Sequence, residues 1–529
     1  MLLCYNTIDS IGQSQYLAIL HPAKRDRNKK SSGENAMRKV RKSQMKLGEV
    51  NIADIEFDLR SRDEIPKLLI GLQYIFCTYE LREEVFKILK KIIPKETDPD
   101  NGRPGMELWK IFVLGTLRLN CNWDYDKLQE IVNNHVKVRE MLGHSKIMDE
   151  DYRYALQTLK DNVSLFTPEV LDEINQVVVK AGHNLIKKNG ERGLKGRCDS
   201  FVVETDVHYP TDINLLLDAI RRVIVLVARL YFIFGVDGWR QSKHNLKTVK
   251  KLYNKARKLK RSTSKNEKQK ARRKILIIEA HQAYIDLVEG FLWRVKESIK
   301  TLNGLGCPAV IRLMEIEGYI KDAERQIDQV RRRVIEDKVI PHDEKVFSIF
   351  EEHTEWICKG KAGVPQELGL KVCILEDQYG FILYHKVMEK QTDERVAVPM
   401  VEETKKRFQE LNSCSFDKGF HSLPNRERLG KMLDELILPR KGRLSLKDKG
   451  VEHSEEFIQA RYQHSAVESA INAIENHGLD RCLDHGLKGF KRYVALSVLA
   501  RNLQILGNII QQRELKRLKK REKKYRLAA

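Results

Sequence analysis

Three acidic residues in this sequence have the types and positions needed to bind a divalent cation. Asp199 opens the first predicted strand of a β-rich stretch, and Asp417 ends the short predicted strand SCSFD, where Gly419 allows a sharp turn. Glu468 lies beside the apolar face of a helix predicted over residues 461–482. Strand-end aspartates and a helical glutamate form the all-oxygen ligand set that Mg²⁺ prefers. Two such ions about 4 Å apart can assist displacement at a phosphodiester.

Asp206 is an alternative to Asp199 as the first acid of this set. The two residues are seven positions apart, so on one extended strand their side chains point to opposite faces and lie about 23 Å apart. Only one of them can belong to a single cation site, and strand parity alone leaves both possible. Asp212, together with Thr211, is better explained as the start of a helix.

The charge of the chain indicates a polyanionic partner. The 529 residues include 96 Lys and Arg against 74 Asp and Glu, which gives a net charge of +22. Residues 240–274 alone contain sixteen basic residues and one acid. A run of this kind is often only a solvated helix face, but at this density contact with phosphates is the better interpretation.

Cysteine usage and apolar runs bear on the compartment of the protein. The nine cysteines show no C-x-x-C pairing, which is typical of reduced thiols rather than of a disulfide framework. The most apolar run, residues 223–236, is interrupted by Arg229 and is too short to span a bilayer. The first residues lack the features of a signal peptide. We therefore expect a soluble, cytoplasmic protein with no membrane contact.

Changes in pattern along the chain predict six segments. They are a basic, disordered segment (1–50), in which Met37 is a possible natural start; a helical domain (51–190); a first strand region (191–212); a basic helical insertion (213–339); a region of alternating strands and helices (340–510); and a basic C-terminal tail (511–529). In the helical domain, GMELWKIFVLGTLRL and YDKLQEIVNNHVKVREML are predicted helices joined by a short linker. This spacing permits a helix-turn-helix for DNA binding, although a bundle that only packs is equally compatible.

Six stretches resemble the landmarks of one family of enzymes. CDSFVVETDVHYPTDINLL, FDKGFHS and HSAVESAINAIENHGLDRC resemble the three catalytic blocks of DDE insertion-sequence transposases, specifically the ISNCY group. KGKAGVPQELG (359–369) and LPRKGR (438–443) are similar to connecting motifs of that family, and RPGMELWKIFVLGTLR is similar to its N-terminal helical domain. The resemblance runs from about residue 40 to 510, with its landmarks in order.

The resemblance implies a fold, a metal site and an activity. The fold would be α/β, with a ribonuclease H-like mixed sheet, a helical insertion after its first strand and an all-helical N-terminal domain. Asp199, Asp417 and Glu468 would be the catalytic, metal-binding triad for two Mg²⁺ ions, with Mn²⁺ as a substitute. The enzyme would bind the inverted repeats at transposon ends, cleave a strand there, and transfer the 3′-hydroxyl into target DNA. It would act in a prokaryotic cytoplasm, associated with the nucleoid, as a homodimer or larger assembly on double-stranded DNA.

The residues around the motifs suggest DNA contacts and one departure from the family pattern. Related transposases carry Tyr, Arg and Lys seven before, four before and seven after the glutamate, where this chain has Arg461, His464 and Glu475. Arg461 and His464 can still contact a phosphate, as can Lys418 and Lys441 beside the other motifs.

Two other functions remain open at this stage. One is a catalytically inactive, transposase-derived DNA-binding protein, and the other is a ribonuclease H-like nuclease that acts in repair or on RNA. A zinc site at His477, Cys482 and His485 is weakly indicated, because the spacing fits no common zinc motif. The sequence contains no nucleotide-binding phosphate loop and no H-x-x-R motif of tyrosine recombinases.

Overall fold

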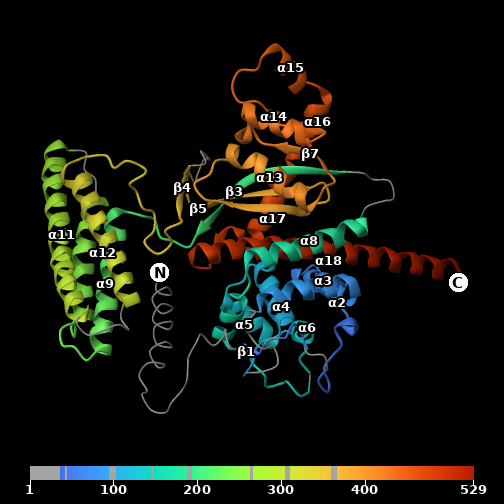
Figure 1. Ribbon diagram of the computed structural model, residues 1–529, viewed down its shortest axis with the longest axis horizontal. Coiled ribbons are helices and arrows are strands. Elements are labelled where there is room, and N and C mark those ends of the chain that lie inside the picture. Colours follow the sequence, from blue (N-terminus) through green and yellow to red (C-terminus); the bar gives the residue numbers. More distant parts are fainter. Residues whose placement is uncertain are drawn as a thin grey trace. The chain divides into compact units, whose positions relative to one another are not determined.

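The computed structural model of the chain divides into two compact units (Figure 1). It describes residues 36–37, 39–41, 45–93, 103–145, 147–186, 193–261, 266–303, 310–358 and 366–528. The helical unit comprises the described parts of 1–56, 73–115 and 125–170, and the sheet unit comprises 57–72, 116–124 and the described part of 171–529. The predicted domain boundary near residue 190 does not coincide with this division, since three segments before it cluster with the sheet.

The secondary structure is mostly helical around one large mixed sheet. The helices are Glu64–Cys77 (α2), Tyr79–Leu89 (α3), Leu108–Asn120 (α4), Tyr125–Asn134 (α5), Val136–Met141 (α6), Leu156–Val163 (α7), Pro168–Ile186 (α8), Asp212–Ile233 (α9), Ser242–Arg261 (α10), Glu267–Asn303 (α11), Val310–Val330 (α12), Asp393–Arg407 (α13), Leu423–Met432 (α14), Leu446–Glu452 (α15), Glu455–His464 (α16), Ala466–Ile474 (α17) and Gly486–Ala528 (α18). Short helical turns are Ile52–Asp54 (η1), Lys90–Ile92 (η2), Arg331–Ile335 (η4), Lys418–Phe420 (η5) and Glu475–Leu479 (η6). The strands are Ala36–Met37 (β1), Arg103–Pro104 (β2), Leu194–Thr205 (β3), Glu355–Cys358 (β4), Gln366–Asp377 (β5), Ile382–Met388 (β6), Leu411–Phe416 (β7), Glu435–Ile437 (β8) and Arg481–Cys482 (β9).

The seven-stranded sheet is built around β3. Strand β5 pairs antiparallel with β3 on one side, and β7 pairs parallel with it on the other, with β8 parallel to β7 at the edge. Strands β4 and β6 both pair antiparallel with the outer side of β5, and the short β9 pairs parallel with the end of β3. In Figure 1, α13 and α14 lie on one side of this sheet, and α17 and α18 lie on the other. The sheet is therefore mixed and covered on both faces.

Strand β3 is longer at its start than the sequence pattern predicts. It begins at Leu194 rather than at the CDS motif, so Asp199 lies in the middle of the strand and does not open it. The early part pairs with both neighbouring strands, and Leu194 and Cys198 are fully buried between them. The polar and glycine residues before Cys198 hide this stretch from a search for apolar alternation.

The predicted hairpin is confirmed, whereas the strand predicted before it is mostly wrong. Strands β5 and β6 turn at DQYG, where the carboxylate of Asp377 accepts hydrogen bonds from the backbone N–H groups of Tyr379 and Phe381. In VFSIFEEHTEWIC only the last four residues form a strand, β4. The Ser348 hydroxyl accepts the backbone N–H groups of Phe350 and Glu351, and this local turn competes with strand pairing.

Four helices between β3 and β4 form a bundle with its own core. The fully buried side chains of α9, such as Ile220 and Val227, pack with those of α11 and α12, such as Val288 and Ile316. On α10, Val249 and other buried residues face this core, while lysines cover the opposite side. The long chain segment between β3 and β4 is thus a folded helical insertion.

Helix α18 is long and apolar enough, by length and composition alone, to cross a membrane between Gly486 and Lys524. However, 72% of its apolar window is buried inside the protein. Asn502 on this helix is buried and hydrogen bonds to the backbone of Ile382 in β6 at 2.9–3.0 Å. These contacts are those of a core helix, and a buried core helix can have the same length and apolar composition as a membrane span.

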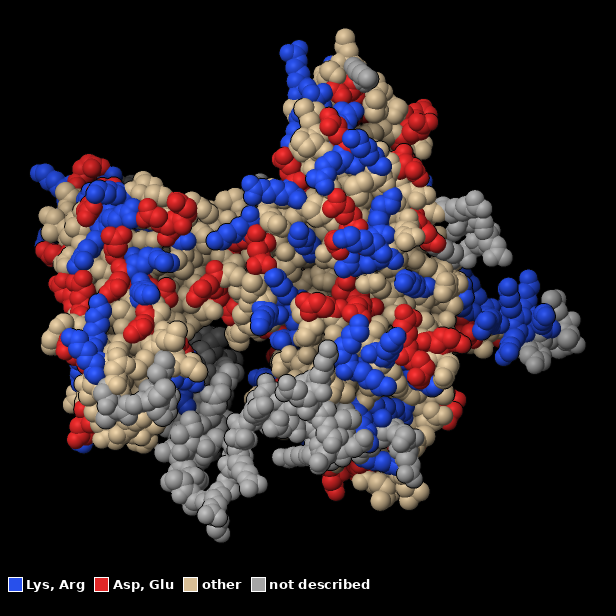
Figure 2. All heavy atoms as spheres, in the orientation of Figure 1, with Lys and Arg blue, Asp and Glu red and all other residues tan. Residues whose placement is uncertain are grey.

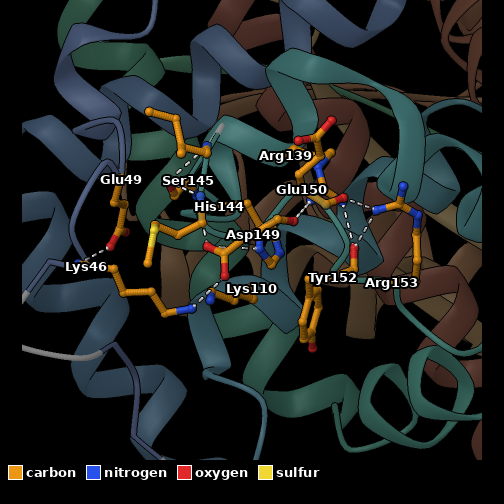
Figure 3. Close-up of polar contacts among 12 residues, drawn as sticks. Lys46, Glu49, Lys110, Arg139, His144, Ser145, Asp149, Glu150, Tyr152 and Arg153 are labelled. Atoms are coloured by element: carbon orange, nitrogen blue, oxygen red, sulfur yellow. Dashed lines mark hydrogen bonds and ion pairs between the residues drawn. The ribbon is translucent and has the colours of Figure 1, made fainter.

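The helical unit packs around aromatic side chains and contains one tightly bonded loop after α6. The rings of Phe76, Phe86 and Trp109 pack against one another with centroids 5.1–6.1 Å apart. Figure 3 shows the loop, in which Asp149 accepts the Ser145 N–H at 2.9 Å.

Histidine and arginine side chains also hold this loop through hydrogen bonds. His144 hydrogen bonds through Nε2 to the Tyr154 hydroxyl at 2.7 Å, and burial lowers the pKa of this histidine to about 4. Arg139 donates to the carbonyl oxygens of Asp149 and Tyr152, so buried polar groups hold the loop in place (Figure 3).

A close crossing of α2 and α18 within the sheet unit gives a test of this packing. A Cβ atom on Gly507 would overlap the backbone carbonyl oxygen of Lys67, and one on Gly71 would overlap that of Leu503. We therefore expect Gly507→Ala to lower the free energy of unfolding by about 3 kcal/mol, because a rotamer change cannot relieve overlap with backbone. The measurement is urea denaturation followed by circular dichroism.

Gly290→Ala in α11 is the matched control, since a Cβ there meets nothing within 4 Å. This substitution should be neutral or should stabilise the helix by about 0.5–1 kcal/mol. Equal effects of the two substitutions would contradict the proposed close contact.

Candidate acidic site

The parallel pairing of β3 and β7 leaves part of the β3 edge open. Strand β7 ends at Phe416, which is paired with Cys198, whereas β3 continues to Thr205. On this edge β9 pairs only with the last two residues of β3. The edge of β3 between these two partners therefore lies without a strand beside it, in the part of the chain that the structure describes.

Asp199 and Asp417 meet at the start of this open edge. Each follows directly after a member of the Cys198–Phe416 pair, so they are the next residues on neighbouring parallel chains, which are about 4.8 Å apart in a sheet. Asp417 ends the extended backbone and is followed by the turn η5. The sequence brings these two acids together only through the register of strands that are far apart along the chain.

Glu468 comes to the same region on helix α17, which contacts β3. The predicted single helix over 461–482 is wrong in detail. The chain forms α16 and α17 with a break at Ser465, and then a distorted turn in which Gly478 has φ 107°. Val467 and Ile474 are fully buried, as expected, and Glu468 is exposed in the first turn of α17.

The acids are close enough for their charges to interact. Burial raises the pKa of Asp199 to about 6, and repulsion from Asp417, Asp393 and Glu468 contributes to this increase in that order. A hydrogen bond of 2.7 Å from the Ser200 N–H to the Asp199 carboxylate acts in the opposite direction. Asp199 is thus a half-buried acid beside other acids.

Asp393 is a fourth acid that the sequence analysis missed. It lies in the first turn of α13, where its carboxylate accepts the Ser200 hydroxyl at 2.6 Å and pairs with Lys371 at 2.9 Å. A Cβ on Gly419 would lie 3.3 Å from the same carboxylate, which places Asp393 against η5. In sequence, an acid at the start of a helix is ordinarily explained by the helix dipole, and no local signal distinguishes this one.

His464 interacts electrostatically with two of the predicted acids and with a second missed residue, Arg197. Its Nδ1 is 2.9 Å from the Ser415 hydroxyl. Burial lowers the pKa of His464, although Asp417 and Glu468 oppose this shift, so the imidazole is neutral at pH 7. Arg197 also interacts with this histidine and pairs with Glu376 at 3.3 Å. Arg197 and Asp199 are two residues apart on β3, so their side chains point to the same face of the strand. This spacing is the sequence signal that could have identified Arg197.

The remaining predicted contact residues surround the acids at different degrees of exposure. The Lys441 ammonium donates to the carbonyl oxygen of Gly419 at 2.8 Å, so the LPRKGR and FDKGFHS stretches meet at η5. Lys418 and Arg461 are exposed. Of the KGKAGVPQELG stretch, residues 359–365 lie outside the described residues.

Asp206 lies beyond the end of β3 and away from this group. It is exposed, and its carboxylate is 3.7 Å from the Arg481 guanidinium. It is not among the charges with the largest effect on the pKa of Asp199. At the next helix, Thr211 supplies the capping hydroxyl and Asp212 pairs with Arg333 at 2.9 Å.

The donor chemistry of the acidic site fits a hard cation. Carboxylate oxygens are the ligands that Mg²⁺ prefers. A bound cation would also stabilise carboxylates that repel one another, because it neutralises their charges. As the described side chains stand, no group of three or more His, Cys, Asp and Glu is close enough to hold a metal ion. Asp417 and Glu468 are exposed, so rotation of their side chains is unobstructed by the core.

The weakly indicated zinc ligands are engaged elsewhere. His477 hydrogen bonds to the carbonyl oxygen of Asn120, and His485 pairs with Glu351 at 2.9 Å. Cys482 is buried in β9. These residues do not form a cluster of ligands among the described residues.

A cavity of about 390 Å³ lies at the other end of the strands, near Lys195, Asn412 and Glu435. It is lined by the first residues of β3, β7 and β8, whereas the acids follow the end of β7. The cavity is therefore separate from the acidic site.

Comparison with known proteins adds no assignment. No protein-family model matches this chain, and searches against curated proteins and against solved structures give no match. The functional interpretation therefore depends on the geometry of the acidic site and on the sequence motifs.

The raised pKa of Asp199 predicts that its charge destabilises the fold at neutral pH. A carboxyl group with a pKa of about 6 when folded and 3.8 as its ordinary value loses stability as pH rises from about 4 to 6. Asp199→Asn should therefore increase the free energy of unfolding at pH 7 by about 2 kcal/mol, and this gain should vanish below about pH 4. Thermal denaturation at a series of pH values measures both effects.

Asp206→Asn is the control for this experiment, because Asp206 is exposed on the same chain segment. It should change stability by less than about 0.5 kcal/mol at either pH. Destabilisation by Asp199→Asn at pH 7 would show that the carboxylate contributes favourable contacts rather than repulsion.

Proposed function

We propose that this chain is a DNA transposase of the DDE type, with Asp199, Asp417 and Glu468 as its metal-binding catalytic residues. The observation that carries the proposal is the convergence of these acids at the open edge of β3. They come from two neighbouring parallel chains and a helix in contact with β3, and their charges act on one another. The six sequence stretches that resemble the ISNCY group support the same assignment.

The strand arrangement supports a ribonuclease H-like catalytic core. In chain order β3, β5, β6, β7 and β8, the second strand is antiparallel to the first, and the fourth and fifth are parallel to it. The third strand lies outside the second, and the fourth lies on the opposite side of the first. This is the order expected for a ribonuclease H-like sheet with a helical insertion after its first strand.

The proposed chemistry begins with hydrolysis of a phosphodiester at the transposon end, in which water attacks phosphorus and a 3′-hydroxyl leaves. That hydroxyl then attacks a phosphodiester of target DNA, which joins the transposon strand to the target and releases a 3′-hydroxyl of the target strand. Asp199, Asp417 and Glu468 would hold Mg²⁺, or Mn²⁺ in its place. When bound, two such ions would supply Lewis acidity at the scissile phosphate. The half-buried Asp199, whose carboxylate accepts the Ser200 N–H, is the least exposed of the three donors.

Neighbouring side chains would position the DNA strand. Lys441 fixes the turn after Asp417 through its bond to Gly419. The exposed Lys418 and Arg461 are available to contact phosphates of the bound strand. His464 is neutral at pH 7, so in this proposal it donates or accepts a hydrogen bond rather than neutralising a phosphate.

Helix α10, within the basic insertion, would extend the contact with DNA. Helix α10 buries one face in its bundle and exposes six lysines on the other: Lys243, Lys247, Lys250, Lys251, Lys255 and Lys258. Charge of this density binds the phosphate backbone without reading bases. The helical unit, which contains the predicted helix-turn-helix segment, would recognise the inverted repeats, and two ends would be joined by a dimer or larger assembly.

The triad predicts a specific loss of activity. Asp199→Asn, Asp417→Asn and Glu468→Gln should each reduce Mg²⁺-dependent strand cleavage of an inverted-repeat duplex by at least about 100-fold, since each removes a ligand worth several kcal/mol. Their affinity for the same duplex should change by less than about threefold. Gel analysis of labelled duplex and fluorescence anisotropy measure the two quantities.

Asp206→Asn serves as the control, because Asp206 is an exposed acid outside the site. Asp206→Asn should keep full cleavage because its carboxylate lies near Arg481 instead. Binding without cleavage by the unaltered protein in both Mg²⁺ and Mn²⁺ would favour the inactive, transposase-derived DNA-binding protein. Hydrolysis without strand-transfer products would favour a ribonuclease H-like nuclease.

Protonation of Asp199 predicts the pH dependence of cation binding. Its carboxylate is ionised above its pKa of about 6 and takes up a proton below it, in competition with the cation. Affinity for Mn²⁺ should therefore fall by up to about tenfold for each pH unit below 6. Isothermal titration between pH 5 and 8 tests this, and an affinity that stays constant down to pH 5 would exclude Asp199 as a ligand.

A further inference from the structure

The last turns of α18 form a basic helical arm, defined here as residues 513–524. The sequence pattern predicts only a basic tail here. In the structure it continues the core helix without interruption, and most of its side chains are exposed. Figure 1 shows α18 extending past the sheet, and Figure 2 shows Lys and Arg side chains gathered on that projection.

The charges of the arm are arranged on one side of the helix. At about 100° per residue, the basic side chains occupy an arc of about 200°. They are Arg513, Lys516, Arg517, Lys519, Lys520, Arg521, Lys523 and Lys524. The acids Glu514 and Glu522 and the apolar Leu515 and Leu518 occupy the remaining arc.

Four of these residues form a straight central stripe. Arg513, Arg517, Lys520 and Lys524 follow one another at intervals of four, three and four residues, so they lie within about 60° of one another and span about 16 Å along the helix axis. Among the described residues, only Arg517 of this stripe contacts an acid, Glu514, at 2.6 Å. The stripe thus presents a row of cations to solvent.

We propose that this arm binds the phosphate backbone of double-stranded DNA and anchors the sheet unit to it. This inference builds on the proposed function, which supplies the identity of the polyanion. The same helix packs against β6 through Asn502, so a phosphate held by the arm is connected to the sheet by continuous helix. A regular row of cations matches the dense, evenly spaced charge of a duplex.

The composition of the arm disfavours two other occupants. An interfacial membrane helix needs a broad apolar face, whereas the arm offers only Leu515 and Leu518 between two acids. A second copy of the arm would place like charges opposite each other, which is destabilising.

The test compares two variants that lose the same number of positive charges. The stripe variant is Arg513→Gln, Arg517→Gln, Lys520→Gln and Lys524→Gln, and glutamine preserves helix propensity. The control variant carries Gln at Lys296, Lys300, Lys338 and Lys406, which are exposed and each within 2.7 Å of a glutamate. Circular dichroism confirms that both variants fold.

Binding to a 30-base-pair duplex without inverted repeats is measured by fluorescence anisotropy over a range of salt concentrations. We expect the stripe variant to bind at least about tenfold more weakly at low salt, with the slope of log affinity against log salt reduced by up to about 3.6, or 0.9 for each lost phosphate contact. The control variant should change affinity by less than about threefold.

Equal DNA affinity of the stripe and control variants would overturn the inference, as would arm-dependent binding to vesicles of phosphatidylserine and phosphatidylcholine without arm-dependent binding to DNA. Cleavage of an inverted-repeat duplex at saturating protein separates this inference from the proposed function. Arm-dependent DNA binding by a protein that cleaves nothing would support the arm and reject the transposase. Cleavage by the unaltered protein, together with equal DNA affinity of the stripe and control variants, would support the transposase and reject the role of the arm.

Discussion

The burial of one carboxyl group beside others, at the open edge of β3, is the constraint that the rest of the sheet unit has to offset. Burial raises the pKa of Asp199, and the nearby carboxylates of Asp417, Asp393 and Glu468 raise it further. Such a cluster costs folding free energy, which the surrounding core must offset. The buried side chains beneath it, including Cys198 and Phe416, come from β3, β5, β7 and α13 and form one continuous cluster. The acids are thus held together by a scaffold that is stable enough to tolerate them.

Much of the local structure around the site followed from the sequence. The hairpin at DQYG, the strand that ends at Asp417 and the buried positions Val467 and Ile474 were all predicted from alternation and helical spacing. The place of Asp199 within its strand was not, because the polar start of β3 becomes a strand only through pairing with β5 and β7. Non-local pairing of this kind leaves no periodic signal.

The open edge itself and the fourth acid were also beyond sequence reasoning. The edge results from a difference in strand length between β3 and β7, and a register between strands so far apart cannot be read from either one. Asp393 resembles any acid at a helix start until its bonds to Ser200 and Lys371 are known. The predicted helix over 461–482 missed the break at Ser465, since apolar spacing continues across it. Similarly, the helical nature of the C-terminal arm is inherited from the buried half of α18, which supplies the nucleus that a charged segment alone lacks.

The insertion between β3 and its later partners has a consequence for biosynthesis. A ribosome delivers β3 first, then the whole four-helix bundle and the hairpin, and only afterwards β7 and α17. The bundle has its own apolar core and can fold as it emerges, whereas β3 must wait for a neighbour that is still untranslated. At roughly 5–20 residues per second this delay lasts many seconds, during which an apolar strand edge is exposed. The acids can therefore meet only near the end of synthesis, so a truncated chain that lacks β7 and α17 would contain an intact bundle and no assembled site.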